Sequence, residues 1–227
     1  MKLGLRLTTA IVLAFLVLVP FALLAILVIG DATPLHHADA AVTTALHSWA
    51  LDHPKWVDLN LAWSLVFGPF PLRLGALVLV AWLLRRRAKR LAIFVVTTMA
   101  VGGVLGVLLK LLVGRHRPDL LEPVARAAGF SFPSGHALNA ALAAGVFVLV
   151  LLPVVKKRWL LWSAAVAVTV LTGVSRIVLG VHWSSDVLAG WLLGIAVVAA
   201  MAAAFSRRGL EAVVEEGVEP EALMHSK

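Results

Sequence analysis

The chain contains no cysteine and no tyrosine, and only 14% of its 227 residues are charged. Without cysteine, disulfide bonds, thiolate chemistry and cysteine-ligated zinc sites are excluded, and the redox compartment cannot be inferred. Charged residues make up about 25% of an ordinary soluble domain. Here 61% of the residues are hydrophobic and the mean hydropathy is +0.98. This shortage of charge predicts an integral membrane protein.

The charge that is present is mostly basic, giving a formal net charge of +8. The lysines and arginines stand in clusters between apolar runs rather than along a polar surface. This arrangement favours topology signals and contact with anionic lipid headgroups over nucleic-acid binding. We therefore expect the bilayer and a lipid as partners, and no nucleic acid.

Six apolar segments reach or approach the roughly 20 residues that a helix needs to cross a bilayer. They cover residues 8–29, 57–84, 91–113, 135–154, 159–180 and 184–205. The predicted fold class is therefore all-α, a polytopic membrane protein with six transmembrane helices. The second segment contains Gly68-Pro69-Phe70-Pro71 and Arg73, so its first part (57–67) is open to interpretation as a separate interfacial helix that leads into a short span. The first segment is too long for a signal-peptide core, which favours an uncleaved anchor over cleavage near Ala38-Asp39-Ala40.

Basic clusters give the orientation. They fall at every second boundary, at Lys2 and Arg6, 85–90, 156–158 and 207–208. The positive-inside rule makes that side cytoplasmic, so both termini are predicted inside a plasma membrane, and the composition suggests a bacterial one. The chain then divides into a membrane domain (1–206) and a short acidic cytoplasmic tail (207–227). The remaining boundaries, and the polar clusters on them, are predicted to be extracytoplasmic.

The most informative polar cluster contains His182 and Asp186. Residues four apart share one face of a helix, and a carboxylate that accepts one imidazole N–H leaves the other nitrogen as a nucleophile or base. Ser184-Ser185-Asp186 is typical of a helix start, and the positive end of the helix dipole favours a bound anion. The alternative is that His182 is an interfacial anchor and Asp186 only a helix cap.

A second cluster, Pro133-Ser134-Gly135-His136, precedes the fourth apolar segment. Ser134 is predicted as the helix N-cap, and free backbone N–H groups beside a glycine suit phosphate oxygens. His136 is placed to act as a general acid toward a leaving alkoxide. The alternative is an ordinary cap followed by an interfacial histidine.

Three cations complete the pattern. Lys110 and Arg117 are seven residues apart, about two helical turns, and offer a point charge and a bidentate fork for phosphate oxygens. Snorkelling at the membrane edge is the alternative for both. Arg176 lies within an apolar segment, where an arginine costs about 2.5–3.5 kcal/mol on insertion scales and is usually paired or functional.

Taken together, these clusters form three motifs: Lys, six residues, Arg-Pro; Pro-Ser-Gly-His; and Ser-Arg, five residues, His, three residues, Asp. Their order and spacing over residues 110–186 resemble the signature of the type 2 phosphatidic acid phosphatase family without a departure. The six-segment arrangement extends the resemblance to most of the chain. The segment 31–56 and the acidic tail are not covered by it.

The resemblance implies a role for each matching residue. His182 would be the nucleophile that forms a phosphohistidine, Asp186 would orient it, and His136 would protonate the leaving group and then activate water. The implied phosphate-binding residues are Lys110, Arg117, Ser134, Gly135 and Arg176. Arg115 and His116 occupy free positions of the first motif and rank below these residues.

No carboxylate cluster typical of a magnesium site lies near the motifs, so we predict metal-independent chemistry without a cofactor. The outer segment carries His36, His37, His47 and His53 with three nearby aspartates. Their spacing matches no reliable zinc pattern, and an interfacial helix at 40–51 anchored by Trp49 is favoured. We expect segment 119–132 to influence substrate selectivity.

The predicted function is hydrolysis of a lipid phosphate or pyrophosphate at the extracytoplasmic face. Phosphatidic acid, phosphatidylglycerol phosphate and undecaprenyl diphosphate are the candidate substrates. The alternative from another class is a non-catalytic binder or transporter of anionic lipid that uses the same basic site. Phosphotransfer to an acceptor other than water is also open, whereas nothing in the sequence suggests the related chemistry of vanadium haloperoxidases.

Overall fold

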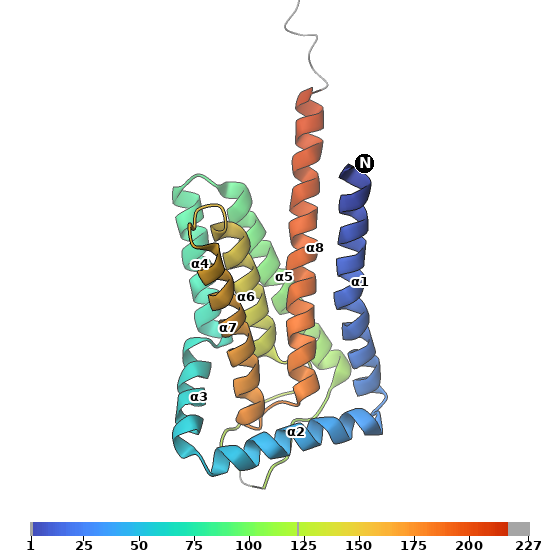
Figure 1. The fold of residues 1–227 in the computed structure, drawn as a ribbon, viewed down its shortest axis with the longest axis vertical. Coiled ribbons are helices and arrows are strands. Elements are labelled where there is room, and N and C mark those ends of the chain that lie inside the picture. Colours follow the sequence, from blue (N-terminus) through green and yellow to red (C-terminus); the bar gives the residue numbers. More distant parts are fainter. Residues whose placement is uncertain (1, 122, 218–227) are drawn as a thin grey trace, which may run out of the picture.

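The computed structural model describes residues 2–121 and 123–217, and side chains within 15–121 and 123–205. All regular secondary structure in this part of the chain is helical (Figure 1). The helices are α1 (Lys2–Ile29), α2 (Thr33–Leu51), α3 (Pro54–Val66), α4 (Pro69–Arg85), α5 (Lys89–Val113), α6 (Gly135–Leu151), α7 (Arg158–Val178) and α8 (Ser184–Gly217).

Helix α6 is the centre of the bundle and packs against α4, α5, α7 and α8. Alanines on several sides of α6 are fully buried, as expected of a helix that is apolar all round. Small residues also bring α8 close to it. A Cβ at Gly190 of α8 would lie 2.7 Å from the Ser134 carbonyl oxygen and 2.9 Å from the Ala137 Cβ. This close approach places the start of α8 against the start of α6.

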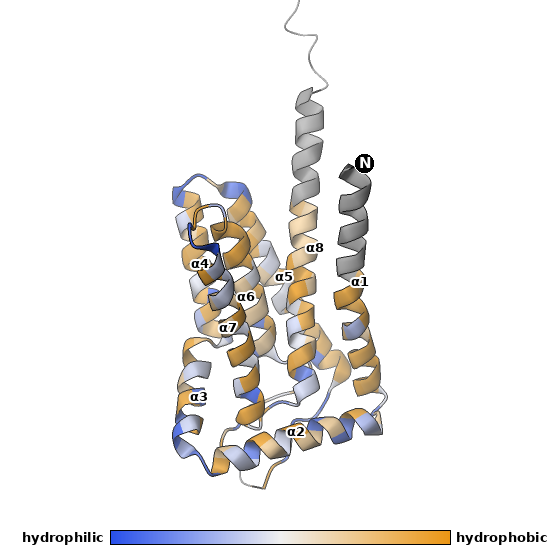
Figure 2. Ribbon diagram, viewed as in Figure 1, coloured by the Kyte–Doolittle hydropathy of each residue, from blue (hydrophilic) through white to orange (hydrophobic). Residues whose placement is uncertain are grey.

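Four helical segments of the described chain are long and apolar enough to cross a membrane: α3 with α4, α5, α7 and residues 184–205 of α8. A fifth arises if α1 and α2, which are bent by 97°, count as one span. Helix α6 is apolar but has only 17 residues. Many large hydrophobic side chains are exposed on the outside of the bundle, and the ribbon coloured by hydropathy is mostly hydrophobic along its helices (Figure 2). An apolar exterior of this extent fits contact with lipid.

Helix α2 lies across one end of the bundle, and α3 turns from it toward α4 (Figure 1). The predicted interfacial helix at 40–51 corresponds to the later part of α2, which begins at Thr33. The predicted interruption before α4 is present, because α3 ends at Val66 and α4 begins at Pro69. The two helices nevertheless qualify together as one candidate span. The segment 57–67 therefore continues the line of α4 rather than lying along α2.

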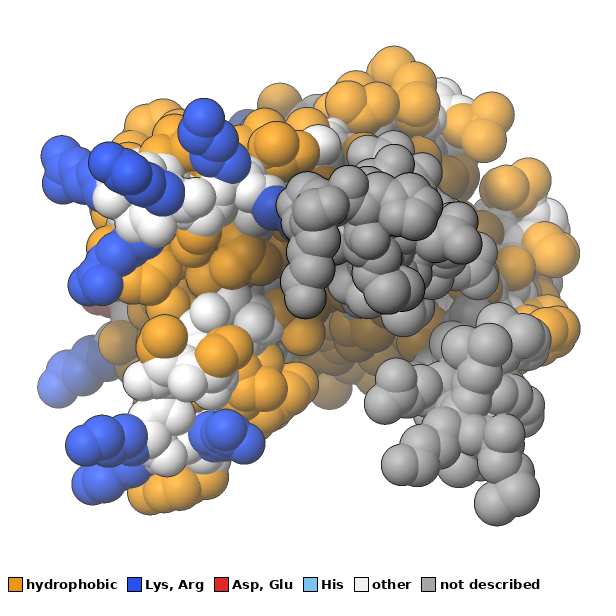
Figure 3. All heavy atoms as spheres, turned by 90° about the horizontal axis from the view of Figure 1, so that it is seen from above, with side chains coloured by type: hydrophobic (Ala, Val, Ile, Leu, Met, Phe, Trp, Pro, Cys, Tyr) orange, Lys and Arg blue, Asp and Glu red, His pale blue; other side chains and the backbone are white. Residues whose placement is uncertain are grey.

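The opposite end of the bundle carries the basic clusters, and Figure 3 shows lysine and arginine side chains gathered on one side of this end, at the left of the view. The described part of α8 runs on to Gly217, so the proposed division at residue 206 falls within a helix. Residues 211–216, with the sequence EAVVEE, contain several good helix formers, which accounts for the extension. The rest of the predicted tail, 218–227, lies outside the described residues.

Candidate active site

The three sequence motifs meet at the end of the bundle that α2 covers. The Ser134 backbone N–H donates to the Asp186 carbonyl oxygen at 2.9 Å, which joins the second motif to the third. Arg117 Nη1 lies 3.1 Å from His182 Nε2, which joins the first motif to the third. His136 interacts electrostatically with His182 and with all three predicted phosphate-binding cations. The structure therefore brings the predicted site residues into one cluster.

His182 is 2% exposed and is held between a carboxylate and a guanidinium. Its Nδ1 lies 3.3 Å from Asp186 Oδ2 and its Nε2 faces Arg117. An arginine can only donate, so this network assigns the proton to Nδ1 and the lone pair to Nε2. That is the tautomer required of a nucleophile that attacks through Nε2.

The environment of His182 keeps its imidazole neutral. Burial lowers the pKa of His182 to about 4, although the hydrogen bond and negative charge of Asp186 oppose the shift. The positive charges of Arg117 and Lys110 lower it further. Since the ordinary value is about 6.5, the side chain has an available lone pair throughout the neutral range.

This shift predicts the acid side of the pH profile. If His182 attacks as the neutral base, its contribution to kcat/KM stays constant from pH 7 to about pH 5 and falls as the pH passes through about 4. The measurement is kcat/KM against pH, divided by the separately determined ionisation of the substrate phosphate. If kcat/KM still falls near pH 6.5 after this correction for the substrate, the nucleophile titrates as an ordinary solvent-exposed histidine.

Backbone carbonyl groups of the loop before α6 and of the α7–α8 connection hold two of the cations. Lys110 Nζ donates to the Phe130 carbonyl oxygen at 2.8 Å. Arg117 donates from Nε to the Gly129 carbonyl oxygen at 2.9 Å and from Nη1 to that of Val181 at 2.6 Å. Burial lowers the pKa of Arg117, opposed by the charge of Asp186, but a guanidinium remains charged. Both cations are thus fixed near His182, and no carboxylate of residues 15–121 and 123–205 forms an ion pair with either.

Two buried polar atoms of the predicted phosphate site have no partner among the described residues. They are Ser134 Oγ and Arg176 Nε. Ser134 occupies the N-cap position of α6, as predicted, but its hydroxyl makes no capping hydrogen bond. The same guanidinium of Arg176 donates from Nη1 to Ser64 Oγ of α3 at 3.0 Å. Buried groups of this kind are normally satisfied, so the two atoms fit a bound anion.

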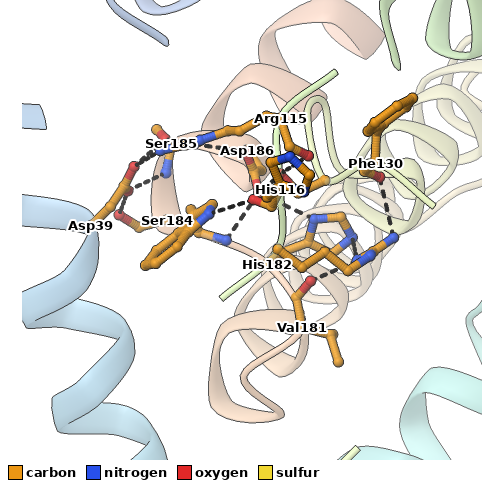
Figure 4. Close-up of polar contacts among 12 residues, drawn as sticks. Asp39, Arg115, His116, Phe130, Val181, His182, Ser184, Ser185 and Asp186 are labelled. Atoms are coloured by element: carbon orange, nitrogen blue, oxygen red, sulfur yellow. Dashed lines mark hydrogen bonds and ion pairs between the residues drawn. The ribbon is translucent and has the colours of Figure 1, made fainter. Parts of the chain in front are cut away.

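An additional ion pair supports the histidine and aspartate, and the sequence did not assign it to the site. Arg115 donates from Nη1 to Asp186 Oδ1 and from Nη2 to Asp39 Oδ2, both at 2.8 Å. Asp39 also accepts the Ser185 N–H at 2.8 Å and the hydroxyls of Ser184 and Ser185 (Figure 4). A carboxylate of α2 therefore reaches Asp186 through one arginine.

Asp39 is fully buried, and its charge is stabilised locally. Burial raises its pKa, but the hydrogen bonds from Ser184, Ser185 and Arg115 outweigh burial and leave the pKa below its usual value. In the sequence, Asp39 is only one of several acidic residues of an outer segment. The four-residue spacing of Asp39, Thr43 and His47 places them on one face of a helix, but only their burial in the structure shows that this face is turned inward.

The remaining outer histidines do not gather with acids. The rings of His36 and Trp183 lie 5.6 Å apart, and those of His53 and Trp49 lie 4.5 Å apart. Within the described residues no three histidine or acidic side chains are grouped as metal ligands. The loop predicted to influence selectivity lines a cavity of about 410 Å³ together with Arg117, Gly180 and Val181. This cavity borders the site.

Comparison with known families settles the relationship of the chain. The model of the PAP2 superfamily matches residues 90–210, more than half of the sequence. The chain belongs to this family. The resemblance predicted from the three motifs is confirmed.

Curated relatives are lipid phosphatases by name. The chain is 35% identical over 119 residues to an undecaprenyl-diphosphatase of Sulfolobus acidocaldarius, covering 49% of this chain and 54% of that protein. It is 42% identical over 91 residues to phosphatidylglycerophosphatase B of Bacillus subtilis, covering 38% and 44%. A lipid A 1-phosphatase of Rhizobium etli is 34% identical over 110 residues, covering 44% of each. The matches thus span about half the length of these relatives.

A solved structure shares the fold. It is a transmembrane PAP2-type phosphatidylglycerolphosphate phosphatase from Bacillus subtilis, with a TM-score of 0.77 and 24% identity. The likeness covers 86% of this chain and 96% of the other. It confirms an all-helical membrane fold of the PAP2 type.

Proposed function

We propose that the protein hydrolyses the terminal phosphate of a membrane lipid through a phosphohistidine on His182. The observation that carries this proposal is the Nε2 lone pair of a buried neutral histidine, set among three cations and two unpartnered buried donors. The names of the relatives support a lipid phosphate as the substrate.

In the first step the substrate phosphate replaces the internal partners of the cations. Its oxygens accept hydrogen bonds from the cations, the Ser134 hydroxyl and the Gly135 N–H at the start of α6. Arg117 Nη1 turns from His182 Nε2 to a phosphate oxygen, which frees the lone pair. His182 Nε2 then bonds to phosphorus while the bond to the lipid oxygen breaks, and His136, as the imidazolium, gives its proton to that oxygen and becomes neutral.

The second step releases phosphate. Neutral His136 takes a proton from a water molecule as the water oxygen bonds to phosphorus, and the electron pair of the P–N bond returns to His182. Asp186 stabilises the positive charge that His182 carries in the intermediate. Because Lys110, Arg117 and Arg176 neutralise the phosphate oxygens, the proposed reaction uses no metal ion.

The placement in the membrane is part of the same proposal. We assign six crossings: α1, α3 with α4, α5, α6, α7 and α8. The basic clusters at 85–90 and 156–158 lie at the end of the bundle away from α2 and the site (Figure 1), so the positive-inside rule predicts both termini in the cytoplasm and the site at the extracytoplasmic face of the plasma membrane. Substrate then approaches from the outer leaflet.

Phosphate release by the purified protein in detergent with excess EDTA tests this proposal. Phosphatidic acid, phosphatidylglycerol phosphate and undecaprenyl diphosphate are supplied in parallel, and we expect release from at least one that persists in the chelator. Activity lost in EDTA and restored by magnesium would contradict the metal-independent chemistry. A folded protein that binds these lipids and releases no phosphate would instead support the binder or transporter.

A further inference from the structure

An arginine lies inside the predicted membrane span, away from the three motifs. Arg73 follows the first turn of α4, and its side chain is exposed on the outside of the bundle. No carboxylate of the described residues forms an ion pair with it, and its Nε donates to Asn139 Oδ1 at 2.9 Å. Charged residues at such depth are costly and usually serve a function.

Asn139 connects Arg73 to the phosphate site. It is 3% exposed, and its Nδ2 donates to the carbonyl oxygen of Gly135 at 2.8 Å. His136 and Asn139 are three residues apart on α6, so they are neighbours on one side of that helix. A Cβ at Gly68 would lie 3.5 Å from His136 Nε2, which places His136 beside the start of α4. Arg73 therefore lies beside α6 about one helical turn farther from the start of that helix than His136, the proposed acid.

The guanidinium also borders a groove between α4 and α5, of about 580 Å³. Arg73 is the only charged residue that lines this groove in the described chain; its other walls are alanine, valine, leucine, methionine and glycine. A Cβ at Gly103 would lie 3.7 Å from Arg73 Nη2, so the glycine leaves space for the guanidinium. An apolar groove with one cation at the end nearest the catalytic histidines suits a lipid chain that carries an anionic group.

We propose that Arg73 binds a second phosphate, the one that stays on the lipid after hydrolysis. This inference rests on the proposed function, in which the leaving group departs on the side of His136. In a lipid diphosphate, the bond from the terminal phosphorus to the bridging oxygen breaks and its electron pair stays on the lipid phosphate. That product is an anion, and a cation in a medium of low dielectric constant stabilises it strongly. Phosphatidic acid instead leaves neutral diacylglycerol, to which Arg73 offers no charge interaction.

The preferred substrate class is therefore a lipid with two phosphates in sequence. A polyprenyl diphosphate has its second phosphate directly attached to the first, whereas phosphatidylglycerol phosphate has it beyond a glycerol. Both lipids present an anionic phosphate group to the guanidinium of Arg73, and the experiment compares them.

The test measures kcat/KM of the Arg73→Gln variant with undecaprenyl diphosphate, phosphatidylglycerol phosphate and phosphatidic acid. We expect a loss of about 30-fold or more with at least one of the two-phosphate lipids, mostly in KM, and of less than about 3-fold with phosphatidic acid. Arg73→Lys keeps the charge and is expected to recover part of the loss. Arg85→Gln, at the far end of the same helix, is the matched control and leaves all three values unchanged.

Equal losses with all three lipids, or no loss with any, would overturn the inference. Binding of undecaprenyl phosphate, compared with uncharged undecaprenol, gives a readout that does not need turnover. We expect Arg73→Gln to weaken the binding of undecaprenyl phosphate by about 10-fold or more and to leave the binding of undecaprenol unaffected. If the wild type hydrolyses nothing but shows this difference, the proposed function fails while the phosphate subsite stands. If it hydrolyses lipids and shows no difference, only the subsite fails.

Discussion

Replacing His182 by alanine is expected to reduce kcat for phosphate release by about 10⁴-fold or more, since the variant has no atom that can form the phosphohistidine. The cations that bind phosphate are unchanged, so affinity for a lipid phosphate or for inorganic phosphate should stay within a few-fold of the wild-type value. Steady-state phosphate release and equilibrium binding, measured on the same preparation, separate the two effects. Rapid quenching of the wild type with a ³²P-labelled substrate should also yield an acid-labile labelled protein that the variant lacks.

The matched control is His37→Ala, which removes an exposed histidine of α2. It should leave both kcat and binding unchanged. Substantial turnover by the His182→Ala protein would show that the attacking group is another residue or water. Loss of both turnover and binding, with a folded protein, would indicate that His182 mainly supports the phosphate site.

Replacing Asp39 by asparagine is expected to lower kcat by about 100-fold and to destabilise the protein, because removing one partner of a buried ion pair costs about 3–5 kcal/mol. Without Asp39, Asp186 is the carboxylate that still pairs with Arg115, so the positive charge of Arg115 offsets more of the negative charge of Asp186. Asp186 then stabilises the positive charge on His182 less strongly. The acid limb of the pH profile should then move to lower pH, since Asp186 raises the pKa of His182. The measurements are kcat, the thermal midpoint in detergent and kcat/KM against pH.

A double variant distinguishes this ion pair from simple packing. Asp39→Asn combined with Arg115→Gln removes both charges and should recover part of the stability that the first change loses. Asp52→Asn, an exposed acid at the end of the same helix, is the control and should have no effect. Additive losses in the double variant, or an unchanged pH profile in Asp39→Asn, would contradict a positioning role.

The sequence predicted the parts of the site that depend on local spacing. His182 and Asp186 are four residues apart, and Ser134 stands at a helix start, so their relation follows from helix geometry. Helix alternation across the membrane then predicted that the three motifs share one boundary. The break before α4 was also readable, because Gly68-Pro69 interrupts the apolar run.

Contacts between distant parts of the chain could not be predicted in this way. Asp39 and Arg115 are separated by 76 positions, and Arg73 and Asn139 by 66. Asp39, Arg73 and Asn139 lie on helices whose rotation about their own axes is set by packing, whereas Arg115 lies in the loop after α5. Apolar composition alone specifies neither the rotation of the helices nor the path of that loop. The inward face of α2 became recognisable only once the burial of Asp39 was known.

The position of Asp39, Ser64 and Gly68 has a consequence for how such proteins diversify. All three precede residue 90, where the match to the family model begins, yet they contact Arg115, Arg176 and the surroundings of His136. The residues assigned to the reaction thus lie in the part of the chain that the family model matches, whereas some of the residues that surround them lie before it. Exchanging the segment before residue 90 between relatives should therefore alter which lipids are accepted, while the catalytic and phosphate-binding residues of the three motifs stay the same.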